Sequence, residues 1–353
     1  MTRRKPPSRR VVTGYRPAPM RPSPPLWHRL LVMGGLLGLL AAASLLYYAN
    51  GRYELPAEGL TVDVQHGGVR AVAEQLVSQG LGSNDTAFWV LARASGLASS
   101  IKAGRYRFAE GSTPYSVLEQ MARGETVKVS ITLVEGLRFS QWRAQLATES
   151  ALRHETAGLD EAQLMNELGA PGVAAEGQFL PDTYVVSYGT ADRVVLRMAY
   201  RAMQQALTDA WTRRSSLAAV QTSQEALVLA SIVEKETGAA DERPLIAGVF
   251  GNRLRRGMLL QTDPTVIYGL GDTFNGNLTR ADLTRDTPWN TYTRAGLPPT
   301  PIAMPGRAAL LAATQPAKTE ALYFVATGGG RHVFSESLAQ HNVAVQQLVR
   351  RTR

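Results

Sequence analysis

The sequence predicts an α+β protein with an N-terminal transmembrane helix, a small α/β subdomain and a C-terminal mixed α/β domain. Three observations lead to this prediction: an uncharged apolar run near the N-terminus, short strand and helix patterns that alternate after it, and longer helical patterns with a glycine-rich hairpin in the second half. The expected segments are a basic tail at residues 1–28, a transmembrane helix at 29–49, a small α/β region at 50–128, a connecting α/β subdomain at 129–177 and a last domain at 178–353.

The net charge of +9 in 353 residues suggests nucleic-acid binding at first. Its position argues against that function, because eight Lys and Arg residues and no acidic residue lie within residues 1–29. The rest of the chain is nearly neutral, so we expect no nucleic-acid partner. The basic tail has too few apolar residues to fold, and we expect it to lie against anionic lipid headgroups. The absence of cysteine excludes disulfides and thiolate metal sites.

The apolar run at residues 30–48 carries no charge, and as a helix it would span roughly 28 Å, close to the hydrocarbon thickness of a membrane. Trp27 precedes it, and Tyr47 and Tyr48 end it, as is typical of membrane interfaces. A cleaved signal peptide would have a shorter apolar core, and a buried core helix would show a polar stripe. Because the basic residues precede the run, we expect a cytoplasmic N-terminus and an exported remainder.

Periodicity places the other elements. Strands are expected at residues 60–64, 106–108, 127–134, 322–326 and 332–334, and helices at 69–80, 85–96, 114–124, from 140 onward, at 192–217, at 223–238 (capped by Ser223 and ended by Gly238) and at 337–349. Residues 150–176 carry no strong pattern, and residues 179–184 predict a loop that leads into the last domain.

One unit of the small α/β region is more specific. Thr113 is expected to cap a helix that has Pro114 in its first turn and ends at Gly124. Together with the strand and the Gly-Ser-Thr turn before it, this helix resembles part of a LysM module, the small βααβ fold that binds N-acetylglucosamine-containing glycans. Any other small α/β unit is the alternative interpretation.

The helix at 223–238 (SQEALVLASIVEKETG) places one carboxylate on its apolar face. Glu236 follows three apolar residues at the spacing of one helix face, whereas Glu234 lies nearer the edge of that face. Burial and the negative end of the helix dipole both raise the pKa of a carboxyl group in this position. A raised pKa suits a general acid for glycosidic cleavage. An ion-paired or solvated glutamate at a helix end is the alternative interpretation.

Two further segments mix polar and aromatic side chains with prolines. The segment LQTDPTVIYG holds Gln261, Thr262 and Asp263, and the segment PWNTY holds Asn290 and Tyr292. Sugar sites use such residues, because aromatic faces stack on sugar rings while amides and hydroxyls bond the ring oxygens. We therefore expect these five residues to support catalysis or bind substrate. A proline-rich structural loop would explain the prolines but not the side chains between them.

The sequence predicts no cofactor and no metal. His332 and His341 lie on different expected elements with no third ligand type nearby, which is a weak metal pattern. A serine nucleophile would need a G-x-S-x-G elbow, which the sequence does not have. The glycines at 328–330 belong to a hairpin and not to a phosphate loop, because no helix with a lysine begins after them.

Four segments, in this order, resemble the endolytic murein transglycosylases of the YceG-like family: SIVEKET, FGNRLRRGMLLQTDPTVIYGLG, NTYTRAGLPPTPIAMPG and PAKTEALYFVATGGGRHVFSESLAQHN. They cover about 120 residues, from roughly 225 to 345. The segments AGRYRF and LVEGLR agree more loosely. The catalytic glutamate of the family falls on the second glutamate of EKET, which is Glu236, and the Glu-Thr pair there resembles the Glu-Ser pair of lysozyme-like transglycosylases.

The resemblance implies a lytic cut of the β-1,4 bond between N-acetylmuramic acid and N-acetylglucosamine that leaves a 1,6-anhydromuramyl end. It implies nascent peptidoglycan strands as substrate, peptidoglycan synthases as membrane partners, and a single-pass inner-membrane protein with a periplasmic catalytic domain that contains a lysozyme-like catalytic helix. Glu234 would then hold the site by hydrogen bonding. Two alternatives remain open: a non-catalytic glycan-binding scaffold of the cell-wall synthesis machinery, and a hydrolase that leaves reducing ends.

Overall fold

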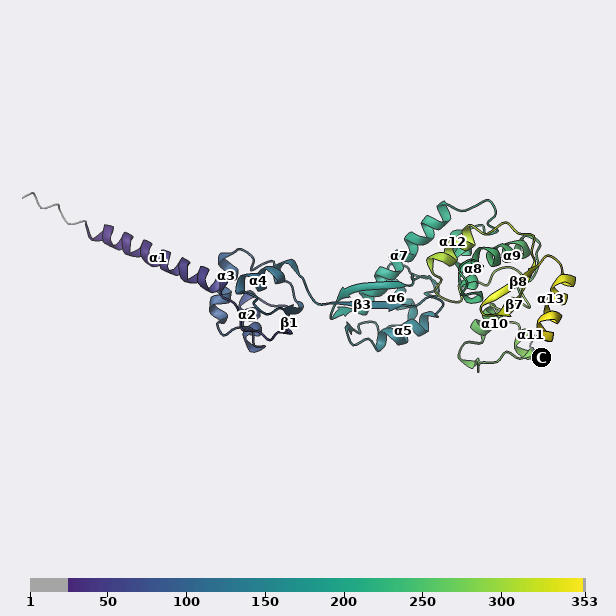
Figure 1. Cartoon of the computed structure of the whole chain (residues 1–353), viewed down its shortest axis with the longest axis horizontal. Coiled ribbons are helices and arrows are strands. Elements are labelled where there is room, and N and C mark those ends of the chain that lie inside the picture. The colour runs from purple at the N-terminus through teal and green to yellow at the C-terminus, as the bar shows by residue number, and fades with distance from the viewer. Residues whose placement is uncertain (1–24, 352–353) are drawn as a thin grey trace, which may run out of the picture. The chain divides into compact units, whose positions relative to one another are not determined.

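The computed structural model describes residues 25–351 and divides the chain into two compact units, which are treated separately here (Figure 1). The first unit comprises residues 1–102 and 108–124, and the second comprises residues 103–107 and 125–353. The predicted basic tail falls almost entirely on residues 1–24, outside the described residues. The predicted boundary at residue 178 lies inside the second unit.

Helix α1 (Leu26–Asn50) covers the predicted transmembrane segment. Between residues 25 and 351 it is the one helix that is long and apolar enough to cross a membrane, with a mean hydropathy of 2.1, and a signal sequence would have the same properties. Its leucines are largely exposed, which is costly in water and favourable in lipid. The backbone adopts an extended conformation at Gly51, so the helix ends close to the end of the apolar run.

The first unit continues in the order that the periodicity predicts. Its elements are β1 (Leu60–Val64), α2 (Val69–Ser78), α3 (Asp85–Ala94) and α4 (Pro114–Arg123), and β2 (Gly104–Phe108) lies between α3 and α4 in the sequence. Thr113 caps α4 and forms a capping box with Ser116, and Gly124 ends the helix with a left-handed φ of 72°. These features of α4 confirm the prediction, because side-chain capping and proline in the first turn are local effects.

The second unit begins with a two-stranded antiparallel sheet and three helices. Its elements are β3 (Lys128–Leu133), α5 (Phe139–Ala147), β4 (Leu152–Arg153), α6 (Glu161–Glu167), β5 (Asp182–Ser187), β6 (Thr190–Ala191) and α7 (Asp192–Thr212). Strand β3 pairs with β5, with Ile131 opposite Tyr184, and β4 pairs with β6 in parallel. The prediction of a loop over residues 179–184 is therefore wrong at its end. Strand β5 depends on a partner about 50 residues earlier, which local patterns do not reveal.

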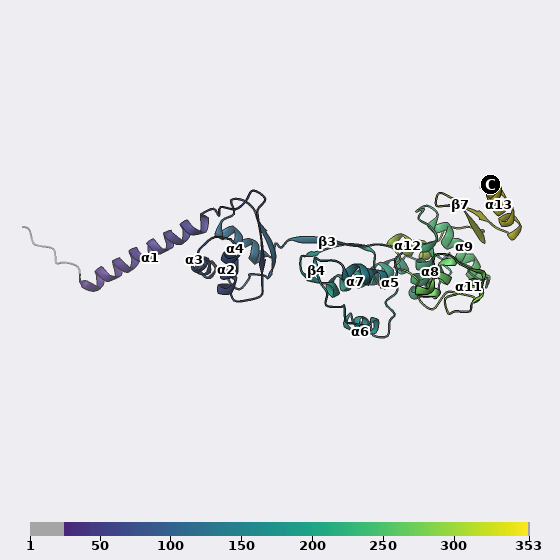
Figure 2. The ribbon, with the colours of Figure 1, turned by 90° about the horizontal axis from the view of Figure 1, so that it is seen from below.

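The remainder of the second unit is mainly helical (Figures 1 and 2). It contains α8 (Ser223–Glu236), α9 (Arg243–Arg255), α10 (Asp263–Leu270), the 3-10 helix η1 (Gly271–Thr273), α11 (Arg280–Thr284), α12 (Arg307–Thr314), the hairpin of β7 (Tyr323–Gly328) and β8 (Arg331–Ser335), and α13 (Leu338–Arg351). The hairpin and α13 were expected. The sequence patterns gave no sign of α6, α9, α11 or α12 as separate helices.

Two hydrophobic cores meet along α7. The N-terminal half of α7 packs into a core with β3, α5, α6 and β5, and its C-terminal half packs into a second core with α8, α9 and α12. Helix α8 is the centre of the second core, since every residue from 226 to 233 is buried. A one-sided apolar stripe is therefore the wrong description of α8. Thr222, and not Ser223, caps the helix, and Glu236 is its last residue, so Gly238 lies beyond the end.

Candidate active site

Glu236 stands at the C-terminal end of the central helix α8, where the buried core opens. Its carboxylate accepts a hydrogen bond from the hydroxyl of Thr262, the residue that precedes α10. Burial raises the pKa of Glu236, and the nearby Asp263 raises it further, while the Thr262 hydrogen bond and the charges of His332 and Arg253 lower it. The net effect favours the protonated acid, as is required of a group that donates a proton near neutral pH.

A cavity of about 180 Å³ opens on Glu236. The described residues that line it are Glu236, Arg253, Leu260, Gln261, Thr262, Asp263, Tyr292 and Phe324. The structure thus brings together five of the seven residues singled out by the sequence. The hydroxyl of Tyr292 donates to Asp263 at 2.6 Å, which fixes the second carboxylate of the cavity. A buried acid beside a hydrogen-bonded carboxylate is the arrangement that separates the roles of two carboxyl groups.

The turn that carries Gln261 and Thr262 is strained. Gln261 has a φ of 50°, and between residues 25 and 351 it is the one non-glycine residue with positive φ. Its backbone N–H donates to the carbonyl of Thr291 at 3.1 Å, and the N–H of Thr262 donates to the Thr291 hydroxyl at 3.1 Å. The segment around Thr291 therefore holds the conformation that directs the Thr262 hydroxyl at Glu236. Strain of this kind is a feature of functional sites.

Asn290 and Glu234 do not line the cavity. The amide nitrogen of Asn290 donates to the carbonyls of Leu283 and Arg285, at 3.1 and 2.7 Å, and its oxygen accepts from the backbone N–H of Tyr292. Asn290 is fully buried, so it positions Tyr292 rather than facing the cavity. The sequence predicts that Asn290 supports catalysis or binds substrate, and these internal bonds favour the supporting role.

Glu234 is more buried than an edge position on α8 implies, with its side chain 4% exposed. It accepts a hydrogen bond from the backbone N–H of Gly306 at 2.9 Å and lies 3.4 Å from Arg243. The edge prediction is wrong because α8 is covered on all sides by α7, α9, α12 and the loop before α12. The expected role of holding the site by hydrogen bonding agrees with these contacts.

Sequence reasoning missed Arg253, which lines the same cavity as Glu236. Its guanidinium donates to the carbonyls of Leu322, Leu259 and Leu260, at 2.7, 3.2 and 2.8 Å. It is only 8% exposed although charged. A helical wheel of α9 would have found it, since Arg253 is three positions after the buried Phe250 on the same face.

His332 and Glu242 form a buried pair near the cavity. The Nδ1 atom of His332 lies 2.8 Å from a carboxylate oxygen of Glu242, and the pKa of Glu242 is lowered by this hydrogen bond in spite of its burial. His341 stacks on Tyr323 instead, with ring centroids 5.4 Å apart. The two histidines noted in the sequence therefore have separate structural neighbours.

Replacing Thr262 by Val is expected to reduce turnover about tenfold and to move the alkaline limb of the pH profile upward. The hydroxyl of Thr262 lowers the pKa of Glu236 by stabilising the carboxylate. Without it the pKa of Glu236 rises, so the protonated form persists to higher pH. The measurement is kcat/KM against pH for the product-forming reaction, with Thr327→Val, at an exposed position near the end of β7, as control. A profile that does not move would contradict the positioning role.

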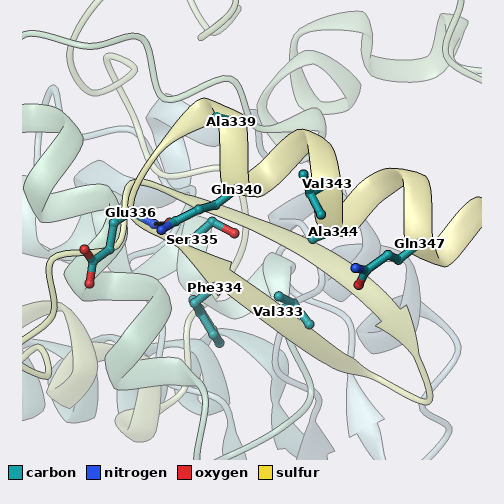
Figure 3. A pocket seen from close by; sticks show the side chains of 9 residues that line it. All are labelled: Val333, Phe334, Ser335, Glu336, Ala339, Gln340, Val343, Ala344 and Gln347. Carbon is teal, nitrogen blue, oxygen red and sulfur yellow. Dashed lines mark hydrogen bonds between the residues drawn. The ribbon is translucent and has the colours of Figure 1, made fainter.

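A separate cavity of about 660 Å³ lies between β8 and α13 (Figure 3). Figure 3 shows Gln340, Val343 and Gln347 on the helix facing Val333 and Ser335 on the strand. Its lining contains none of the seven candidate residues, so it is distinct from the Glu236 cavity.

The fold and the cavity define a protein with a carboxyl group, that of Glu236, at the end of a core helix and facing a polar cavity. The chain belongs to the YceG-like family, whose model matches residues 62–347. It is 31% identical over 299 residues to a protein from Bacillus subtilis (strain 168) named endolytic murein transglycosylase, covering 80% of this chain and 82% of that one. A protein of the same name from Streptococcus pneumoniae serotype 2 is 28% identical over 82% of this chain, which spans 58% of its length.

A solved structure of a YceG-like protein also resembles this chain. The crystal structure of a YceG-like protein from Listeria monocytogenes matches 82% of this chain and 99% of its own chain, at 26% identity and a TM-score of 0.50.

Proposed function

We propose that this chain is a membrane-anchored lytic transglycosylase that cleaves the bond between N-acetylmuramic acid and N-acetylglucosamine in nascent peptidoglycan. The observation that carries the proposal is the position of Glu236, a buried carboxyl group with a raised pKa in a cavity with Asp263. Relatives named endolytic murein transglycosylase support the reaction class. Internal cleavage would terminate or trim growing glycan strands.

In the proposed reaction Glu236 acts twice. As the neutral acid it gives its proton to the glycosidic oxygen, and the bond to the muramyl C1 breaks with both electrons leaving on that oxygen. As the carboxylate it then takes the proton of the muramyl C6 hydroxyl while that oxygen bonds to C1. No water enters, and Glu236 ends protonated as it began. One acid–base residue is therefore enough, in contrast to the two carboxylates that most glycosidases use.

The other cavity residues have supporting roles in this proposal. Asp263, held by Tyr292, offers negative charge to the oxocarbenium-like transition state. Thr262 orients the carboxylate of Glu236, and Gln261 offers an exposed amide at the cavity wall. Asn290 holds Tyr292 in place, and α8 serves as a catalytic helix of the lysozyme-like kind.

The proposed location follows from α1 and the charge before it. The positive residues ahead of α1 favour a cytoplasmic N-terminus, an inner-membrane anchor and a periplasmic catalytic unit. The order β1, α2, α3, β2 supports the proposal that this region is a LysM-like subdomain that binds glycan. Peptidoglycan synthases are the proposed membrane partners, because both would act on strands leaving the membrane surface.

Mass spectrometry of digested glycan strands tests the proposal. The purified full chain in detergent is expected to yield fragments that end in 1,6-anhydromuramic acid. Each such fragment is about 18 mass units, one water molecule, lighter than the product of hydrolysis, because no water is added to the cut bond. Reducing ends without the anhydro bridge would identify a hydrolase. Intact strands that nevertheless co-sediment with the protein would identify a glycan-binding scaffold.

A further inference from the structure

A larger cavity lies directly beside the Glu236 cavity. It has a volume of about 670 Å³, within the roughly 300–1,000 Å³ of typical ligand sites. Lys235 and Pro264 line it, and the residues bonded to them in the chain, Glu236 and Asp263, line the smaller cavity. The two cavities therefore flank the same point, where the end of α8 meets the start of α10. A polymer held at Glu236 has its neighbouring group within reach of the larger cavity.

The larger cavity has an excess of positive charge, because Arg138 and Lys235 line it against one exposed acid, Asp272. In the smaller cavity one arginine, Arg253, accompanies Asp263, and the raised pKa of Glu236 favours its neutral form. A carboxylate on the substrate is therefore attracted to the larger cavity rather than to the catalytic one.

Both cations are held in place by backbone carbonyls rather than by acids. The Nζ atom of Lys235 donates to the carbonyl of Gly136 at 3.1 Å, and Arg138 donates to the carbonyl of Ile267 at 2.8 Å. Arg138 also lies over the ring of Tyr268, 5.1 Å from its centroid. Among the described residues, neither cation belongs to an ion pair.

The acidic residues near Lys235 and Arg138 do not fully neutralise the positive charge of these two side chains. Glu135 and Glu234 both pair with Arg243, at 3.8 and 3.4 Å, and among the described residues neither forms an ion pair with Lys235 or Arg138. Burial raises the pKa of Glu176, which faces Arg138, to about 7, so near neutral pH its carboxylate neutralises Arg138 only in part.

We propose that this larger cavity, the stem subsite, binds the peptide carried by the muramyl residue of the substrate. This inference rests on the proposed function. The lactyl group of a muramyl residue carries a short peptide with free carboxylates, and it branches from the sugar next to the bond that is cut. Arg138 and Lys235 bind those carboxylates, while Tyr268 and Phe274 offer apolar contact to the peptide. The site therefore selects glycan strands whose peptides are still attached.

The test compares uncrosslinked strands that carry peptides with the same strands stripped of peptides by an amidase. For each variant of the full chain, kcat/KM is measured on both substrates, and the ratio between them is the readout. Lys235→Gln is expected to lower this ratio about fivefold, and Lys235→Glu to lower it further, with the difference shrinking at high salt. Lys318→Gln, an exposed lysine on a different cavity, is the matched control and keeps the wild-type ratio.

A binding measurement keeps this inference separate from the proposed function. The Glu236→Gln variant is titrated with a disaccharide-peptide and with the same disaccharide lacking the peptide. Tighter binding of the peptide-bearing ligand, lost on adding Lys235→Glu, supports the stem subsite even if no cleavage is found. Equal binding of both ligands, or an equal loss of kcat/KM on both substrates, overturns it. Absence of anhydro products from the wild type overturns the proposed function alone.

Discussion

Glu236→Gln is expected to reduce the formation of anhydro-ended products by at least about 10³-fold. General acid–base residues contribute typically 10²–10⁴-fold, and Glu236 would act in both proton transfers of the reaction. The amide has nearly the same shape as the acid and its oxygen still accepts from Thr262, so the geometry of the cavity is retained. The measurement is the rate of anhydro-product release by mass spectrometry, with Glu320→Gln on the exposed surface as control.

The Glu236→Gln variant is also expected to change the pH dependence of stability, which can be measured independently of activity. The folded-state pKa of Glu236 is raised above its unfolded value, so the neutral acid is the form that folding favours. Stability associated with this group is present at low pH and is lost as pH rises toward and through the folded pKa. Glutamine does not titrate, so the melting temperature of Glu236→Gln should gain on the wild type as pH rises. A variant that keeps full activity would remove Glu236 from the reaction, whatever its stability.

Arg253→Met is expected to destabilise the second unit by at least about 3 kcal/mol. The substitution keeps the length of the apolar stem but leaves three carbonyls, those of Leu259, Leu260 and Leu322, without their donor. Buried acceptors without a partner cost about 1–3 kcal/mol each. For a unit of this size that corresponds to a fall in melting temperature on the order of 10 °C. Thermal unfolding checks this, with Arg256→Met, at the exposed residue that follows α9, as control.

Activity should fall with Arg253→Met even at temperatures where the chain remains folded. Arg253 anchors the carbonyl of Leu260, and the next two residues form the strained turn that directs Thr262 at Glu236. We expect a loss of about tenfold to a hundredfold in kcat/KM. Removing the positive charge also raises the pKa of Glu236, because Arg253 lowers it in the wild type. A variant as stable and as active as Arg256→Met would show that Arg253 has no such role.

The substitutions proposed at Glu236 and Arg253 are expected to affect both activity and stability, because both residues belong to helices of the same hydrophobic core. Every residue of α8 from 226 to 233 is buried. Its burial fixes the direction of Glu236 because the helix has no freedom to rotate among its neighbours in α7, α9 and α12. A rigid element of this kind holds a catalytic group to within the tolerance that proton transfer needs.

The sequence by itself determined the features that depend on short-range chemistry. The apolar run gave α1, side-chain capping by Thr113 and the turn at Gly124 gave α4, and the glycine-rich turn gave the β7–β8 hairpin. The sequence also singled out Glu236 and most of the residues that line its cavity. These polar residues and the tyrosine stand close together in two short segments, LQTDP and PWNTY, whose composition is visible without the fold.

Only the tertiary structure decided which of those groups face the cavity. Asn290 and Glu234 form hydrogen bonds with backbone groups inside the protein. Arg253, on α9, lines the cavity because its guanidinium donates to carbonyls that lie up to 69 residues away in the sequence. Strand β5 likewise forms only where β3 supplies its hydrogen bonds. Local patterns record which side chain is polar and which face is apolar, but a buried polar group is placed by its partners, and those come from distant parts of the chain.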